Sequence, residues 1–264
     1  SDYKYFLYTC IINAVVGGLL LLYGRGAENK MSRRDGYCVV TLSWVFFTFF
    51  GMLPFYFSGS IDTITNAFFE TMSGFTTTGA TILDDIESLS HGMLFWRSLT
   101  QWIGGLGIVF FTIAILPIFT TGGVQLFSAE STGVTHDRTH PKINVMAKWL
   151  WTIYLVLTVS ETVLLMFGGM SLFDAICQSF ATTATGGYST KQNSISYWNS
   201  PYIEYVVAIF MIVSSINFSL FLMCLKGKVG RLFKDEELHW FLASVGILTF
   251  LITLALVFQN HYDW

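Results

Sequence analysis

Two short polar stretches combine threonine with glycine in a pattern that suits the binding of a cation. The first is ETMSGFTTTGAT, residues 70–81, and the second is ATGGYST, residues 184–190. Glycine can adopt a positive φ, which allows successive backbone carbonyl oxygens to face the same way. Threonine adds hydroxyl oxygens without charge, and a lightly charged oxygen cage suits a monovalent cation better than Ca²⁺.

Each polar stretch follows an apolar run that is too short to cross a bilayer. These runs are Ala67–Phe75 and Ala175–Thr183. A helix of this length reaches only about halfway through the hydrocarbon, at about 1.5 Å per residue. Such re-entrant segments persist only where protein or a watery cavity surrounds their irregular end. The C-terminal end of each half-helix carries a partial negative charge, which would favour a cation at the centre of the membrane.

The two segments form an internal repeat. Writing NAFFETMSGFTTTGAT above DAICQSFATTATGGYS aligns Asn66 with Asp174 and Gly79 with Gly187. Both copies begin with an Asx residue that we expect to be the helix cap. A second alignment, which matches the first Thr-Gly pair of each loop, selects Gly186 as the partner of Gly79. A lone TTTG is typical of a surface turn, but two copies in matching positions indicate a re-entrant architecture.

The composition indicates an integral membrane protein made of helices. Of the 264 residues, 53% are hydrophobic and 12% are charged, whereas soluble domains carry about 25% charged residues. The mean hydropathy is +0.57. Apolar runs long enough to span a bilayer, which needs about 20 residues, are Tyr3–Tyr23, Gly36–Phe57, Met93–Pro117, Lys148–Gly168, Pro201–Leu225 and Leu238–Gln259.

The basic residues predict which side of the membrane each loop faces. Most Lys and Arg lie in segments 25–35, 118–148 and 226–237. Positively charged loops are usually cytoplasmic, so both Thr/Gly stretches should face outside. The four cysteines lie in apolar runs without metal or disulfide spacing.

Several motifs, taken in order, resemble the Trk/Ktr/HKT superfamily of potassium transporters, and within it the TrkH-type membrane subunit. They are FFETMSGFTTTGAT (68–81), QWIGGLGIV (101–109), ILP (115–117), GGVQLFSAE (122–130) and FDAICQSFATTATGGYST (173–190). The resemblance implies a potassium-channel-like fold of four linked repeats around one pore. Each repeat has a span, a pore helix, a filter loop and a second span.

The resemblance divides the chain into two complete repeats and part of a third. Because a carbonyl ring takes four loops and this chain has two, we expect it to be part of a longer protein. The implied regions are 1–35, an extra transmembrane helix and a basic cytoplasmic loop; 36–117, the first repeat, with pore helix 67–75 and filter 76–80; 118–147, a cytoplasmic linker; 148–225, the second repeat, with pore helix 175–183 and filter 184–188; and 226–264, a cytoplasmic loop and the first helix of an incomplete third repeat.

The resemblance also implies which residues bind the ion. K⁺ would bind only at the filter loops, and each loop resembles a single-glycine version of the stricter channel filter, with looser K⁺/Na⁺ discrimination. The implied filter residues are Thr77, Thr78, Gly79, Thr185, Gly186 and Gly187, flanked by Thr76, Ala80 and Tyr188. No organic cofactor is expected.

Three further polar residues are candidates for support or lining of the pore. Glu161 lies inside an apolar run, where a carboxylate is costly; it could face the pore vestibule, pair with Arg97, or lie near the outer interface. Glu70 is expected to steady the first filter by hydrogen bonds from behind. Asn217 is expected mid-span, where it either lines the inner cavity or bonds to a neighbouring helix.

Two other clusters have simpler interpretations. Gly104, Gly105 and Gly107 favour close helix approach or a bend, with a gating hinge as the alternative. His136 and His140 are spaced like metal ligands but lie in a polar loop with no further ligand nearby, so we expect a solvated loop.

The predicted function is uptake of potassium across the bacterial inner membrane, by a channel or a symporter. The resemblance implies a homodimer in the lipid bilayer and a cytoplasmic, nucleotide-binding, TrkA-like regulatory subunit; no nucleic-acid partner is expected. One alternative is a secondary transporter of another cation or small solute with re-entrant helices. A membrane-embedded enzyme is disfavoured, because all five histidines lie in loops or at the ends of the spans.

Overall fold

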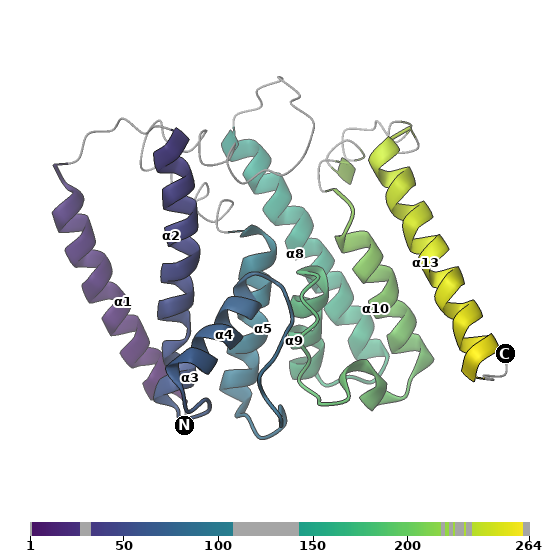
Figure 1. Ribbon diagram of the computed structural model, residues 1–264, viewed down its shortest axis with the longest axis horizontal. Helices are drawn as coiled ribbons and strands as arrows, with labels where there is room; N and C mark the ends of the chain where they lie inside the picture. Colours follow the sequence, from purple (N-terminus) through teal and green to yellow (C-terminus); the bar gives the residue numbers. More distant parts are fainter. Residues whose placement is uncertain are drawn as a thin grey trace. The chain divides into compact units, whose positions relative to one another are not determined.

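The computed structural model describes residues 2–26, 33–107, 143–217, 220–221, 224, 230 and 234–260. Within these residues every regular element is a helix (Figure 1), which confirms the expected helical class. The chain divides into two compact units, Ser1–Ser214 and Ser215–Trp264. Residues 118–142 of the expected linker at 118–147, which include the motif at 122–130, His136 and His140, lie outside the described residues.

The first unit contains four long helices and two short ones that carry the repeat. The long helices are α1 (Tyr3–Gly24), α2 (Arg33–Gly51), α5 (His91–Gly105) and α8 (Ile143–Phe167). The short helices of the repeat are α4 (Ile64–Phe75) and α9 (Leu172–Thr183). The remaining elements are α3 (Leu53–Phe57), the 3₁₀ helix η2 (Ser194–Trp198) and α10 (Pro201–Ser214).

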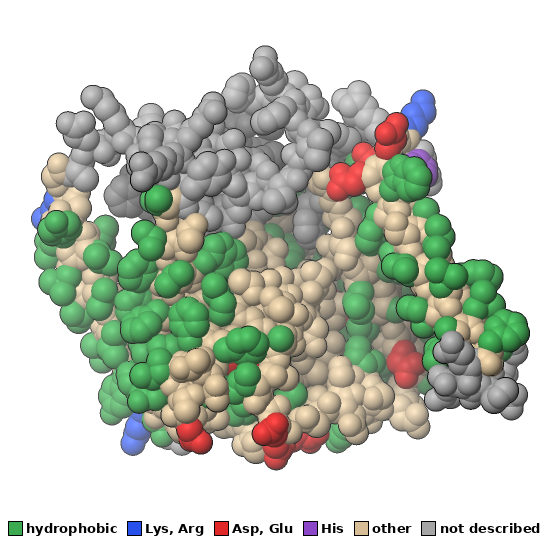
Figure 2. All heavy atoms as spheres, viewed as in Figure 1, with side chains coloured by type: hydrophobic (Ala, Val, Ile, Leu, Met, Phe, Trp, Pro, Cys, Tyr) green, Lys and Arg blue, Asp and Glu red, His purple; other side chains and the backbone are tan. Residues whose placement is uncertain are grey.

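Apolar side chains on the outer faces of the long helices require a lipid environment. Among the described residues, Tyr3–Gly24, Lys148–Phe167 and Glu236–Phe258 are each long and apolar enough to cross a membrane. Most of α1 is unburied within the protein, and Figure 2 shows hydrophobic side chains over α1 and α2. Contiguous apolar surface of this extent on a water-soluble protein would be unusual. The chain is therefore a membrane protein.

The two short helices occupy equivalent places in the packing. Helix α4 packs against α2 and α5, whereas α9 packs against α8 and α10. Helix α5 also packs against α9 and so joins the two halves of the unit. One apolar core surrounds Phe55 and Met93 beside α4, and a second surrounds Leu165 and Ile203 beside α9.

Three predicted spans are interrupted, and one of them, Met93–Pro117, breaks at Leu106, where α5 ends. The run Gly36–Phe57 breaks at Met52, between α2 and α3, where Pro54 in the first turn of α3 has no N–H to continue the helical hydrogen bonds. In the run Pro201–Leu225, α10 ends at Ser214 and residues 215–217 are not helical. The expectation that Asn217 lies inside a helical span is therefore wrong: serine and asparagine side chains compete for backbone hydrogen bonds and weaken helices.

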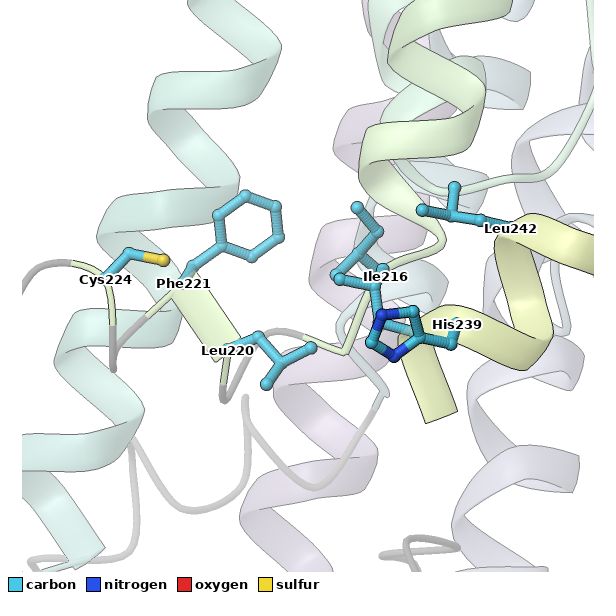
Figure 3. A pocket seen from close by; sticks show the side chains of 7 residues that line it. Ile216, Leu220, Phe221, Cys224, His239 and Leu242 are labelled. Carbon is cyan, nitrogen blue, oxygen red and sulfur yellow. The ribbon is translucent and has the colours of Figure 1, made fainter. Parts of the chain in front are cut away.

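The second unit contains α13 (Glu236–Asn260) and the residues around Asn217. The Asn217 side-chain amide donates to Glu237 Oε2 over 3.3 Å. A pocket in this unit is lined by Ile216, Leu220, Phe221, Cys224, Leu238, His239 and Leu242 (Figure 3). Its lining is almost entirely apolar, so it lacks the oxygen ligands that an alkali cation needs.

Candidate functional site

Helices α4 and α9 begin with the same capping interaction. The Thr63 hydroxyl accepts the Asn66 N–H over 3.2 Å, and the Ser171 hydroxyl accepts the Asp174 N–H over 3.1 Å. Each helix therefore starts three residues earlier than expected, and the prediction of an Asx cap is wrong. A hydroxyl at the N-cap satisfies an N–H that the helix leaves free, and the Asx residue occupies the third helical position.

The two helices also end in the same way. The Thr77 N–H donates to the Gly74 carbonyl and the Thr78 N–H to the Ser73 carbonyl, over 3.0 and 2.9 Å. Equivalent bonds, from Thr185 to Thr182 and from Gly186 to Ala181, measure 2.9 and 2.8 Å. This pair of bonds is the Schellman motif, which normally places glycine in the left-handed conformation.

Both helix ends instead place threonine in the left-handed conformation. The φ of Thr77 is 53° and that of Thr185 is 55°. A residue with a Cβ pays roughly 1–2 kcal/mol there. Strain of this kind often marks a functional site, where surrounding structure holds the backbone in place.

The backbone angles distinguish the two possible alignments of the loops. Gly79 has a φ of 78° and Gly187 a φ of 85°. Gly186 takes the position of Thr78, because each donates its N–H to the last turn of the preceding helix. Gly187 is therefore the conformational partner of Gly79.

We define loop 1 as residues 76–82 and loop 2 as residues 184–190. Each loop has an open side, formed by Thr76, Thr78 and Ala80 in loop 1 and by Thr185 and Gly187 in loop 2. The loops lie against each other, because a methyl group on Gly79 would overlap the Gly186 carbonyl oxygen. The arrangement offers hydroxyl and backbone oxygens from two adjoining strands of chain.

Two glycines of α5 allow both helix ends to approach it. A methyl group on Gly104 would overlap the Phe75 carbonyl at the end of α4. A methyl group on Gly105 would come within 2.7 Å of the Ala184 backbone at the end of α9. The expected close approach at these positions is thus present in the structure.

A buried ion pair lies behind loop 1. Glu70 of α4 and Arg97 of α5 are 1% and 2% exposed, and their Oε1 and Nε atoms are 2.7 Å apart. Glu70 also accepts the Thr81 hydroxyl over 2.9 Å and the Ile82 N–H over 3.0 Å. Buried charges persist when they are paired and hydrogen-bonded, and here three donors from α5 and loop 1 satisfy one carboxylate.

Tyr188 of loop 2 extends behind loop 1 and joins this cluster. Its hydroxyl lies 2.9 Å from the Glu70 carbonyl oxygen and 3.2 Å from that of Ala80. The Arg97 guanidinium carbon lies 3.5 Å from the centre of its ring, a favourable cation–π contact. The Tyr188 N–H donates to Gln101 Oε1 over 3.1 Å.

The arrangement of the helices and loops matches that of known proteins. The family model of the TrkH cation transport proteins matches residues 3–260. The chain is 42% identical to the Trk system potassium uptake protein TrkH of Escherichia coli K12, over 98% of this chain and 54% of that protein. It is 34% identical to TrkG of the same strain, over 92% of this chain and 51% of TrkG.

A solved structure agrees with these sequence relationships. The crystal structure of the potassium transporter TrkH from Vibrio parahaemolyticus superimposes with a TM-score of 0.84 at 32% identity, covering 100% of this chain and 54% of that one. The chain belongs to the TrkH family. It spans about half the length of the curated relatives that it matches.

Of the three positions expected for Glu161 in this TrkH-family chain, two are wrong. Glu161 is fully buried in α8, and the Thr183 hydroxyl at the end of α9 lies 3.4 Å from its Oε2. The expected position near water at the outer interface is therefore wrong. The expected pairing with Arg97 is wrong too, because Arg97 lies against Glu70 and bonds to it.

The segments that follow loops 1 and 2 are also joined to each other. The Ile86 N–H donates to Gln192 Oε1 over 3.1 Å, and Lys191 Nζ lies 3.4 Å from Glu87 Oε2. Partial burial lowers the pKa of Lys191, but the hydrogen bond and the charge of Glu87 outweigh it, so this pKa is raised overall. The ion pair is partly exposed and contributes little to stability.

The residues that support the loops from behind were not predicted from the sequence. Gln101 and Ser73 were not singled out, although Gln101 holds loop 2 and the Ser73 hydroxyl donates to the Ala80 carbonyl over 2.6 Å. The role of Arg97 could have been predicted from the sequence, because a basic residue inside an apolar run needs a buried partner.

Proposed function

We propose that this chain forms part of a potassium-uptake pore whose filter includes loops 1 and 2. The observation that carries the proposal is the shared backbone of the loops, with a left-handed threonine followed by a glycine at positive φ in each. Curated relatives are named potassium uptake proteins. A filter of backbone carbonyls replaces the hydration shell of the ion.

The electrostatics of the short helices support a cation at this place. Helices α4 and α9 both end at the loops, and a helix C-terminus carries about half a negative charge. Threonine hydroxyls on the open sides of the loops add uncharged oxygen ligands. No carboxylate lies among residues 76–82 or 184–190, which favours a monovalent ion over Ca²⁺.

Two loops supply half of a four-loop ring, and the rest would come from parts of the protein beyond this chain. We propose the repeat division of 36–117 and 148–225, with K⁺ bound at Thr77, Thr78 and Gly79 and at their partners in loop 2. Glu70 would support the filter from behind. The assembly would be a homodimer in the inner membrane, with the loops outside and a TrkA-like regulatory subunit on the cytoplasmic side.

Uptake of ⁸⁶Rb⁺ into proteoliposomes that contain the full-length protein tests this function. We expect Rb⁺ uptake that excess K⁺ inhibits, and its loss in Gly79→Val, because the side chain would meet the Gly186 carbonyl. Gly17→Val is a matched control, since no atom lies near a Cβ at Gly17. Uptake that Gly79→Val leaves unchanged, or that K⁺ does not inhibit, would contradict the proposal and favour a transporter of another solute.

A further inference from the structure

We propose that Tyr188, held by Arg97 and Glu70, is a positioning residue through which loop 2 sets the geometry, and hence the ion selectivity, of loop 1. These three residues are called the clamp below. The inference rests on the proposed filter function and assigns a specificity-determining role to side chains on the buried side of the loops.

The clamp has a rigid base in α4 and α5. Arg97 donates from Nε to Glu70 and from Nη1 to the Ser189 carbonyl of loop 2, over 2.7 and 3.0 Å. Both side chains are almost fully buried. A planar guanidinium with two fixed acceptors and a ring against its face has little freedom to reorient.

Tyr188 is restrained at both ends. Its backbone N–H donates to Gln101 Oε1. Arg97 donates to the carbonyl of the next residue, Ser189, and the Tyr188 ring lies against the Arg97 guanidinium. Its hydroxyl lies between the Glu70 carbonyl of α4 and the Ala80 carbonyl of loop 1. The side chain is 1% exposed, so it has no alternative position open to solvent.

The Ala80 carbonyl is the point at which the clamp acts on the proposed filter. It receives the Ser73 hydroxyl over 2.6 Å, and it shares the Tyr188 hydroxyl, which lies 3.2 Å from it and 2.9 Å from the Glu70 carbonyl oxygen. The Ser73 hydroxyl and the shared Tyr188 hydroxyl hold this carbonyl on the buried side of loop 1. Ala80 directly follows Gly79 in the chain. Holding the Ala80 carbonyl in one direction therefore restrains the backbone of residues 77–79, whose carbonyls belong to the proposed filter. Loss of either donor would allow loop 1 to relax.

A relaxed loop should discriminate less between ions while still conducting. Coordination of K⁺ rather than Na⁺ depends on where the carbonyl dipoles are held and how freely they move. Tyr188→Phe removes one hydroxyl but keeps the ring beneath Arg97. We expect the K⁺/Na⁺ permeability ratio of the full-length protein to fall about threefold to tenfold, the range that corresponds to one net hydrogen bond.

The experiment compares K⁺/Na⁺ permeability ratios in planar bilayers for Tyr188→Phe and Tyr205→Phe. Tyr205 is 72% exposed on α10, so its hydroxyl should not matter. Ser73→Ala is a second variant, which removes the other donor to Ala80. Because both donors act on one carbonyl, the effects of Tyr188→Phe and Ser73→Ala on the logarithm of the ratio should be non-additive.

Each outcome bears on the clamp. A lowered ratio in Tyr188→Phe and Ser73→Ala, with Tyr205→Phe like wild type, supports it. A wild-type ratio in Tyr188→Phe overturns it, and so does a wild-type ratio in Ser73→Ala if Tyr188→Phe fails to fold. If the proposed function is wrong, the wild-type protein shows no K⁺ current at all, and both proposals are then wrong. If only the clamp is wrong, the wild-type protein conducts K⁺ and Tyr188→Phe keeps the wild-type ratio.

Discussion

Replacement of Glu70 by glutamine should destabilise the protein far more than removal of any exposed charge. The change keeps the size and shape of the side chain but removes its charge and turns one acceptor oxygen into a donor. Glu70 accepts three hydrogen bonds, from Arg97, Thr81 and Ile82. After the change, at least one of these donors faces an NH₂ group and Arg97 loses its counterion.

The expected cost follows from the burial of the pair. Both side chains are 2% exposed or less, so the Arg97 charge cannot be solvated by water when its partner is neutral. Breaking a buried ion pair by removing one member costs about 3–5 kcal/mol. The Ser189 carbonyl and the Tyr188 ring still face the guanidinium, so we expect about 3 kcal/mol, the lower end of this range.

The measurement is the melting temperature of the purified full-length protein in detergent. Glu87→Gln is the matched control, because it makes the same chemical change in the partly exposed pair with Lys191. We expect Glu70→Gln to lower the melting temperature by several degrees and Glu87→Gln to leave it nearly unchanged. Adding Arg97→Met to Glu70→Gln should recover part of the loss, since it removes the unpaired charge.

Equal melting temperatures for Glu70→Gln and Glu87→Gln would show that the buried pair of Glu70 and Arg97 contributes no more to stability than the exposed pair. That result would mean that the Arg97 charge is either solvated or balanced by another group. A double variant with Arg97→Met that is less stable than Glu70→Gln would also contradict the account, because it would show that the unpaired charge was not the source of the loss.

Three further predictions concern glycines at or near the loops and the N-cap of α9. Gly104→Ala should sharply reduce the yield of folded protein in size-exclusion chromatography, since its methyl group meets the Phe75 carbonyl, whereas Gly17→Ala should not. Gly187→Ala should lower the melting temperature modestly, through roughly 1–2 kcal/mol of strain at positive φ, and Gly79→Ala should lower it more, because its methyl group also overlaps loop 2. Ser171→Ala should cost about 1 kcal/mol in thermal unfolding through the lost cap of α9.

The repeat and the loops could be predicted because their signals are local. Two short apolar runs followed by threonine and glycine occur in the same order, and the structure places α4 and α9 at those runs. Helix starts were harder to predict, since Thr63 and Asn66 are both good capping residues. The choice between them depends on the whole first turn, where Thr63 accepts the N–H three residues ahead.

Features that depend on tertiary contacts could not be predicted in the same way. Arg97 had two buried carboxylates as possible partners, Glu70 and Glu161, and only the packing of α4 against α5 decides between them. The contact of Tyr188 with the Ala80 carbonyl joins residues far apart in the chain. The helix break after Ser214 lies inside a continuous apolar run, where hydropathy alone predicts an unbroken span.

Anomalous diffraction from crystals of the full-length protein in RbCl is the most direct test of the central claim. We expect a Rb⁺ peak between loops 1 and 2, within coordination distance of backbone oxygens of residues 77–79 and 185–187. We also expect this peak to disappear in Gly79→Val. Absence of the peak from the wild-type loops in crystals that bind Rb⁺ elsewhere in the transport pathway would contradict the assignment of these loops as the filter.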